Sequence, residues 1–276
     1  MVRGDEGHHG GVDLSELHSR TDLMAVTGPD EAFARLDPAA EVTGWAYGQA
    51  VSFLRTSAAR PPSLFSWGPD VGALLDVLVD SGIMASFGVA GVSVPWPDRA
   101  EIDARFTGTG GGDWDWMWTT RHSGPNHRLQ SGRLVELDDT RDAAEITELA
   151  AENPRFEGFP GTGHNELWLG ARDDDGTLIA CGAVQRLPAG TAHLGGILVA
   201  SRHRRRGLGT TISAALTDRM VEAEGVCTLG MYSDNDAARS VYHRLGYVTD
   251  KAWASRSIRP VGGAPAEGSV WLGCSS

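Results

Sequence analysis

One short run of residues has the types and spacing needed to bind an anion. Three arginines at 204–206 come directly before Gly207 and Gly209, after the apolar, strand-like run 197–199. Apolar residues recur at helical spacing beyond the glycines, which predicts that a helix begins there. The first turn of a helix leaves backbone N–H groups without internal partners, and glycine lets a bulky anion approach them. The run therefore predicts a site for a diphosphate that the arginines neutralise.

Two common nucleotide-binding loops do not match this run. A Walker loop needs a lysine after its last glycine, whereas Thr210 follows Gly209, and a dinucleotide fingerprint needs a third glycine where Ile212 stands. What remains is the pattern Arg/Gln-x-x-Gly-x-Gly/Ala, with Arg204 and Gly207 at its first two fixed places. In this pattern the chain resembles the GCN5-related N-acetyltransferase (GNAT) family, whose acetyl-CoA pyrophosphate loop has the same form.

A second motif strengthens the resemblance. Asn235, Ala238, Tyr242, Gly246 and Tyr247 occupy every fixed place of the family pattern N-x-x-A-x-x-x-Y-x-x-x-G-[FY]. The same residues suit a helix on general grounds, because asparagine is a favoured N-cap and glycine a suitable terminator. The two motifs occur in the family's order, about one helix and one strand apart.

The resemblance implies that acetyl-CoA is a co-substrate, with no metal required. It assigns main-chain contacts with the pantetheine and the acetyl carbonyl to the strand, and the pyrophosphate to the loop and helix. The implied cofactor-binding residues are Ile197, Leu198, Val199, Arg204, Arg205, Arg206, Gly207, Leu208, Gly209, Thr210, Asn235, Ala238 and Tyr242.

The resemblance also implies two catalytic roles. Tyr242 corresponds to the general acid that protonates the departing thiolate; a phenol titrates near ~10 and a thiol near ~8.5, so the phenol stays protonated at neutral pH. The other interpretation of Tyr242 is a core aromatic. Many family members place a carboxylate base on the strand before the arginine loop, but here that place holds His193, which could instead be a surface histidine in a turn. Glu166 is a further candidate base.

The expected fold class is α/β (α+β), a GNAT-type mixed, mostly antiparallel twisted sheet flanked by helices and preceded by a second α/β domain. A strand at 133–137, a helix at 142–151 and a hairpin turn at 173–176 fit this order. The segment 156–160 sits where the family has its variable acceptor loop, although its aromatic residues could simply cap the core. The resemblance covers 131–258, and we assign 131–276 to the acetyltransferase domain.

The N-terminal half is less informative. Residues 1–12 have the composition of a flexible leader, and 13–130 are interpreted as an N-terminal α/β domain, by analogy a degenerate acetyltransferase-like one without CoA. A helix is expected at 70–80, capped by Asp70 and ending at Gly82.

Tryptophans alternate at 114, 116 and 118, so one face of a strand carries three indoles. Burial against another sheet is the first interpretation of this stripe. The alternative is an aromatic wall for the acceptor at the junction of the two domains.

Composition limits the partners. The formal net charge of −12 disfavours nucleic acid outside the arginine loop, and no apolar span reaches the length of a membrane helix. A polar start and three scattered thiols, Cys181, Cys227 and Cys274, fit a reducing cytoplasm. The expected partner is a small-molecule or peptide amine acceptor, and the chain could form a homodimer.

Two functions remain open from the sequence. The first is an N-acyltransferase that moves an acetyl or short acyl group from CoA to a primary amine by direct attack in a ternary complex. The second is a non-catalytic, acyl-CoA-binding regulatory or structural protein.

Overall fold

A computed structural model describes residues 13–57, 60–124 and 134–259. The leader expected at 1–12 and Cys274 lie outside these residues. The strands are β1 (Ser15–Ser19), β2 (Glu41–Tyr47), β3 (Ala50–Ser57), β4 (Arg60–Trp67), β5 (Gly91–Pro95), β6 (Gly108–Thr119), β7 (Leu134–Leu137), β8 (Asn165–Arg172), β9 (Leu178–Arg186), β10 (Ala192–Val199), β11 (Cys227–Tyr232) and β12 (Val248–Ile258).

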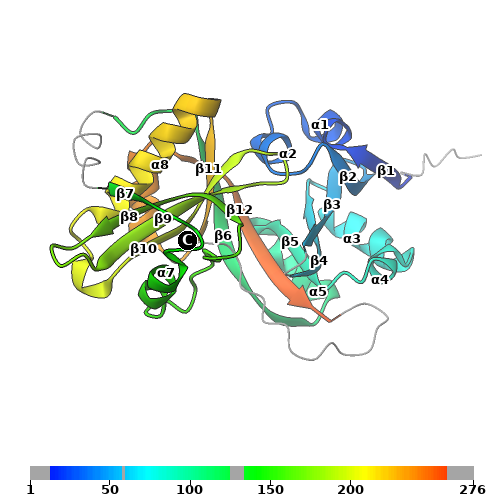
Figure 1. Ribbon diagram of the computed structural model, residues 1–276. Helices are drawn as coiled ribbons and strands as arrows, with labels where there is room; N and C mark the ends of the chain where they lie inside the picture. Colours follow the sequence, from blue (N-terminus) through cyan, green and yellow to red (C-terminus); the bar gives the residue numbers. More distant parts are fainter. Residues whose placement is uncertain (1–12, 58–59, 125–133, 260–276) are drawn as a thin grey trace, which may run out of the picture.

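Helices flank these strands, as expected for the predicted fold class (Figure 1). They are α1 (Arg20–Thr27), α2 (Ala32–Leu36), α3 (Val71–Asp80), α4 (Ile83–Ser86), α5 (Arg99–Arg105), α7 (Ala143–Ala150), α8 (Leu208–Glu224) and α9 (Asp236–Arg244), with short 3-10 turns at Trp96–Asp98 and Ser201–His203.

All of these strands form one sheet in the order β1-β2-β3-β4-β5-β12-β6-β11-β10-β9-β8-β7. Neighbours are antiparallel except at β4–β5 and β10–β11, which are parallel. The order is therefore symmetric about its centre. From either end, the first four strands pair antiparallel and the fourth and fifth strands (β4–β5 or β10–β11) pair parallel. The central strands β12 and β6 follow from both sides. This symmetry gives the N-terminal half the same strand topology as the C-terminal half.

Strands β6 and β12 join the two halves. β12, from the C-terminal half, pairs with β5 and β6 of the N-terminal half, whereas β6 pairs with β11 and β12 of the C-terminal half. The two long strands run side by side through the middle of the molecule in Figure 1. Each half therefore completes its sheet with a strand of the other.

The helix expected at 70–80 is present as α3. Its buried leucines and valine follow helical spacing and fill a core of their own. Asp70 occupies the N-cap position, but its side chain does not cap the helix. Instead, its Oδ2 accepts a hydrogen bond of 2.9 Å from the backbone N–H of Gln49.

The tryptophan stripe is largely buried, although not against a second sheet. Trp114 and Trp116 join Trp253 and several phenylalanines in one aromatic cluster, while Trp118 is half-buried beside it. Phe33 of α2 covers this cluster, with its ring centroid 5.3 Å from Trp116 and 4.8 Å from Trp253. A short helix thus replaces the expected second sheet as the cover.

Opposite faces of the C-terminal sheet carry α8 and α7. Alternate residues of β8 and β9 belong to two hydrophobic clusters, one with Ile212 and Leu216 of α8 and the other with Ile146 and Leu149 of α7. The strand, helix and hairpin turn expected at 133–137, 142–151 and 173–176 are all found, as β7, α7 and the β8–β9 connection.

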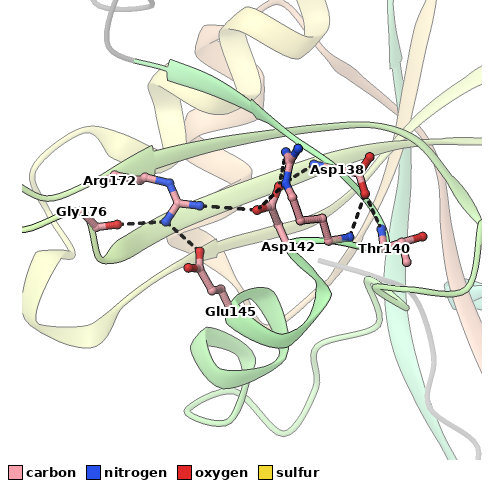
Figure 2. A network of polar contacts seen from close by, with 7 residues as sticks. Asp138, Thr140, Asp142, Glu145, Arg172 and Gly176 are labelled. Atoms are coloured by element: carbon pink, nitrogen blue, oxygen red, sulfur yellow. Dashed lines mark hydrogen bonds and ion pairs between the residues drawn. The ribbon is translucent and has the colours of Figure 1, made fainter.

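Ion pairs and hydrogen bonds fix the start of α7 (Figure 2). Asp142 Oδ2 accepts a hydrogen bond of 2.6 Å from the N–H of Asp138. Arg172 of β8 approaches Asp142 at 3.7 Å and Glu145 at 2.7 Å, and it donates to the carbonyl of Gly176 at 2.9 Å. α7 is thereby tied to the sheet just before the chain enters the segment expected to bind the acceptor.

Candidate functional site

A gap opens in the sheet where the sequence predicts the pantetheine-binding strand. The parallel pairing of β10 with β11 runs through His193–Thr228 and Leu194–Leu229, and beyond it the strands separate. The pairing of β10 with β9 shifts register between Gly195 and Leu198. Such a bulge bends its strand and leaves main-chain groups free of the ladder. Main-chain N–H groups at the end of β10 that do not pair with β9 are therefore available to a ligand.

The arginine loop and the start of α8 lie at the end of β10. Gly207 is the N-cap of α8 in the left-handed conformation, with φ +83°. Arg205 also has positive φ, +61°, and Arg204 Nε donates to the carbonyl of Val199 at 3.2 Å. A Cβ on Gly209 would lie 3.5 Å from Val199, so its absence leaves a hollow beside the helix N-terminus. The exposed arginines and free amides fit the diphosphate of coenzyme A.

The second motif forms the helix α9. Asn235 Oδ1 accepts a hydrogen bond of 3.1 Å from the N–H of Ala238, as expected of an N-cap. Tyr242 is buried, and desolvation raises its pKa to about 12, against a smaller opposing effect of a hydrogen bond with Ser213 of α8. Tyr242 therefore remains a neutral phenol at any physiological pH.

Several of the predicted cofactor-binding residues meet in one place. Tyr242 belongs to the hydrophobic cluster beneath α8, and Ile197, Val199, Leu208 and Ala238 pack against that cluster. The arginines and Gly207 are exposed to solvent, and Asn235, Gly209 and Thr210 are half-buried. Leu198 differs, because its side chain points to the opposite face, among residues that pack on α7, and it pairs with Cys181 of β9.

His193 is not a surface residue in a turn, since it lies within β10 and is only 8% exposed. Desolvation, with smaller contributions from the neighbouring Arg55 and His164, lowers its pKa to about 3. Thr228 Oγ1 donates to the carbonyl of Ala192 at 2.8 Å, so it accepts from His193 Nδ1 at 2.9 Å. The imidazole is therefore neutral, and its Nε2 carries the lone pair.

Glu166, the other candidate base, is placed differently. Its side chain is half exposed and forms an ion pair with Arg186. Hydrogen bonding to that arginine holds the pKa of Glu166 below its usual range. This carboxylate is a structural ion-pair partner at the surface rather than a group of the cavity described next.

A cavity of about 620 Å³ lies where the two halves meet, and His193 forms part of its wall. The N-terminal half contributes β3 and β4, the shared strands contribute Trp114 and Ser255, and the C-terminal half contributes β9, β10 and the expected acceptor loop. Its polar lining residues are Arg55, Thr56, Ser57, Arg60, Ser63, Glu157, Thr162, His164, Gln185, Arg186, His193 and Ser255.

Glu157 is a residue of this cavity that the sequence did not single out. Its side chain is 3% exposed, and Arg60 of β4 pairs with it at 2.6 Å. Burial raises the pKa of Glu157, and the neighbouring Arg60 partly opposes that rise. The available signal was an acidic residue inside the expected acceptor loop, beside its two aromatic residues. Of those, Phe156 packs on the core whereas Phe159 is 40% exposed at the cavity.

The N-terminal half carries no comparable anion site at the start of α3. Asp70 stands where the C-terminal half has arginines, and a Cβ on Gly48 would collide with its carboxylate. A Cβ on Gly72, in the first turn of α3, would likewise collide with Glu101. Two carboxylates thus fill the end of this helix and would repel a diphosphate.

Comparison with known proteins identifies the class. Residues 134–247 match the sequence model of the Acetyltransferase (GNAT) family, so this part of the chain is a GNAT acetyltransferase domain. That family uses acetyl-CoA as co-substrate, and the geometry of the arginine loop and of Gly207 suits it. No curated protein matches the chain.

Solved structures extend the likeness to the N-terminal half. A Drosophila protein has a TM-score of 0.58 at 16% identity, covering 91% of this chain and 100% of its own. A tandem GNAT protein from the clavulanic acid biosynthesis pathway, without acetyl-CoA, has a TM-score of 0.50 at 17% identity over 92% and 99%. A protein described as a GNAT acetyltransferase from Novosphingobium aromaticivorans has a TM-score of 0.50 at 22% identity over 76% and 88%. These likenesses establish a tandem GNAT-like fold.

Three further observations concern the described thiols, the possible metal ligands and the helices. Cys181 and Cys227 are free and buried, and desolvation raises each thiol pKa to about 12, so neither is a nucleophile. Within the described ranges, no cluster of His, Cys, Asp or Glu is placed to hold a metal ion. Among the helices described, none combines the length and apolarity needed to cross a membrane.

Proposed function

We propose that the chain is an acyl-CoA-dependent N-acyltransferase that moves an acetyl or other short acyl group to a primary amine by direct attack in a ternary complex. The observation that carries the proposal is that β10 is shared by two sites. Its bulged end leads into the arginine loop on one side, and His193 on the same strand lines the cavity on the other. A thioester and an amine bound at these sites would meet at one strand.

Acetyl-CoA supplies the reactive thioester when bound. The amides of the first turn of α8, with Arg204 and its neighbours, bind the diphosphate, and the main chain of Ile197 and Val199 holds the pantetheine and the acetyl carbonyl. Tyr242 donates a proton as the thiolate leaves. His193 presents a neutral acceptor, Nε2, to the N–H of the attacking amine. The chain thus positions both reactants and places one donor and one acceptor beside them.

The remaining expectations belong to this proposal. The acceptor is a small-molecule or peptide amine, the enzyme works in the cytoplasm without binding nucleic acid or membrane, and it can form a homodimer. A non-catalytic, acyl-CoA-binding regulatory or structural role would use the same donor site but would not need the cavity beside His193.

Two measurements test the function. Calorimetry with acetyl-CoA should give saturable binding, and Arg204→Ala together with Gly207→Ala should weaken it. A thiol-release assay with acetyl-CoA and a panel of primary amines should show turnover above hydrolysis for at least one amine. Binding of acetyl-CoA without release by any amine would favour the non-catalytic role, and no binding would refute both.

A further inference from the structure

We propose that the cavity between the halves is the acceptor site for a small primary amine, and that Glu157, held by Arg60 of the other half, binds the ammonium group and accepts its proton. This inference rests on the proposed function. It adds a substrate class and a residue for which the motifs give no role.

One carboxylate oxygen of Glu157 accepts a hydrogen bond, and the other has no donor among the described residues. Arg60 Nη2 donates to Oε2 at 2.6 Å. In the part of the chain that the structure describes, nothing donates to Oε1, although this atom is buried. A buried carboxylate oxygen without a donor costs free energy, because it has lost its hydrogen bonds to water and has formed none with the protein. The ammonium group of a ligand in the cavity is the kind of donor that would restore the missing hydrogen bond.

The loop that carries Glu157 is fixed next to the reacting strand. Asn165 Nδ2 donates to the carbonyl of Gly158 at 2.6 Å, and Gln185 Nε2 donates to Asn165 Oδ1 at 3.1 Å. A Cβ on Gly196 would lie only 3.3 Å from the Cα of Gly158, so the loop packs on the bulge of β10 itself. Glu157 is therefore adjacent to the place where the acetyl carbonyl is proposed to bind.

The protons balance with Glu157 as the acceptor. An alkylammonium ion gives one proton to the Glu157 carboxylate and becomes a nucleophilic amine. Its nitrogen then forms a bond to the acyl carbon, the carbon–sulfur bond breaks, and the thiolate takes a proton from Tyr242. The amide nitrogen loses its second proton, which restores the Tyr242 phenol through solvent, and Glu157 returns its proton to solvent. One proton is released for each amide and thiol formed.

Glu157 suits this transfer better than His193 does. The pKa of His193 is lowered to about 3, which makes it a poor acceptor for a proton from ammonium, whereas burial raises the pKa of Glu157. His193 then orients the neutral amine through Nε2. The charged and titratable side chains that share the cavity with Glu157 are Arg55, Arg60, His164, Arg186 and His193.

The size and walls of the cavity favour a small acceptor. Its volume of about 620 Å³ falls in the range of sites that enclose drug-sized molecules. Strands from both halves form its walls, so an acceptor must fit between them.

The test uses the full chain and a thiol-release assay with acetyl-CoA. The probes are butylamine, putrescine, glucosamine and phenethylamine, with a long lysine-containing peptide as the large acceptor. We expect turnover with at least one small amine and none above hydrolysis with the peptide. For the best amine, Glu157→Gln should lower kcat/KM at least tenfold and remove the acid limb of its pH profile. Glu157→Asp, which keeps a carboxylate, should recover part of the loss.

The matched control is Glu148→Gln, the same chemical change on the exposed face of α7, which should leave all constants unchanged. Calorimetry should show that acetyl-CoA binds Glu157→Gln within twofold of the parent, which separates acceptor recognition from folding. If Glu157→Gln does not fold, the comparison rests on Glu157→Asp. Unchanged kcat/KM in the variants, or turnover of the peptide alone, would overturn this inference and leave the proposed function standing. Failure of the parent chain with every acceptor would overturn both.

Discussion

Burial shifts two ionisable side chains of the site in opposite directions and leaves both neutral. Desolvation raises the pKa of Tyr242 to about 12 and lowers that of His193 to about 3. At pH 7 the tyrosine therefore has a proton to donate and the histidine has a lone pair to offer. Neither group needs a charged partner to remain in this state.

The first prediction at this scale concerns Tyr242→Phe. The substitution keeps the ring in its cluster and removes only the hydroxyl, so acetyl-CoA should bind within threefold of the parent. If the phenol protonates the leaving thiolate, kcat should fall by about 10²-fold or more. Steady-state kinetics with calorimetry check this. Tyr47→Phe, in the N-terminal half, is the control, and equal turnover in Tyr242→Phe would remove the acid role.

The second prediction concerns His193 and acid stability. The folded-state pKa of about 3 lies below the ordinary value of about 6.5, so the unfolded chain binds the extra proton. This contribution to stability is complete above pH 6.5 and is lost as the pH falls towards 3, by about 1.4 kcal/mol per pH unit.

Denaturant titrations at pH 6.5 and 4.5 measure that loss. The parent chain should lose about 2 kcal/mol more between these pH values than His193→Gln does. His18→Gln removes an exposed histidine and should behave as the parent does. Equal acid sensitivity in the parent and His193→Gln would mean that the imidazole is solvated in the folded state.

The residues proposed for the donor site could be named from the sequence, whereas those of the cavity could not, for a physical reason. Arg204, Gly207 and Tyr242 lie just before a helix, at its N-cap and on a helix face, and a short motif encodes such local geometry. Glu157 acquires its environment from Arg60, far away in the chain, and from a cavity that exists only after both halves have folded. No spacing in the sequence reveals such a pairing.

At the scale of elements, the position of α8 depends on the close approach of β9. A Cβ on Gly182 would lie 2.5 Å from Ile197 Cδ1 and 2.7 Å from Ile212 Cγ2. These distances are shorter than carbon atoms tolerate, so the two isoleucine side chains, or α8 itself, would have to shift. The glycine thus allows α8 to pack closely on β9.

The third prediction follows from that contact. Gly182→Ala should destabilise the fold by about 1–3 kcal/mol through overpacking and should also weaken acetyl-CoA binding. Denaturant titration and calorimetry measure the two effects. Gly108→Ala is the control, because the nearest atom to a Cβ there lies 3.9 Å away. A destabilised variant with unchanged affinity would show that α8 keeps its place relative to β10.

The elements of the C-terminal half were predicted closely, since β7, α7, α8 and α9 begin within two residues of the expected positions. In the N-terminal half the helix at 70–80 was predicted, but the cover of the tryptophan stripe was not. That cover is Phe33 of a five-residue helix, α2. A helix so short has too little periodicity to stand out in a sequence.

At the scale of the whole molecule, a symmetric sheet carries an asymmetric pair of sites. In each half a helix connects the two parallel strands, α3 between β4 and β5 and α8 between β10 and β11. α8 begins among arginines and glycines, whereas α3 begins beside Asp70 and Glu101. The N-terminal half retains a separate use, since β3 and β4 form a wall of the cavity. The half without an anion site at its helix thus forms part of the proposed acceptor cavity.

The last prediction concerns the two halves expressed as separate chains, 1–130 and 131–276. The expected domain boundary falls between them, but β6 and β12 each complete the sheet of the other half. A chain of 131–276 would leave β11 and β12 without β6, and the indole of Trp253 without Trp114. Unpaired strand edges and bare aromatic rings promote aggregation.

Each half alone should therefore be insoluble or lack a cooperative unfolding transition, and 131–276 alone should not bind acetyl-CoA. Coexpression should instead give a soluble one-to-one complex that binds it, because the two strands can still pair across the break. Size-exclusion chromatography, thermal melts and calorimetry distinguish these results. A monomeric 131–276 that melts cooperatively and binds acetyl-CoA with the affinity of the full chain would show that the shared strands are dispensable for the donor site.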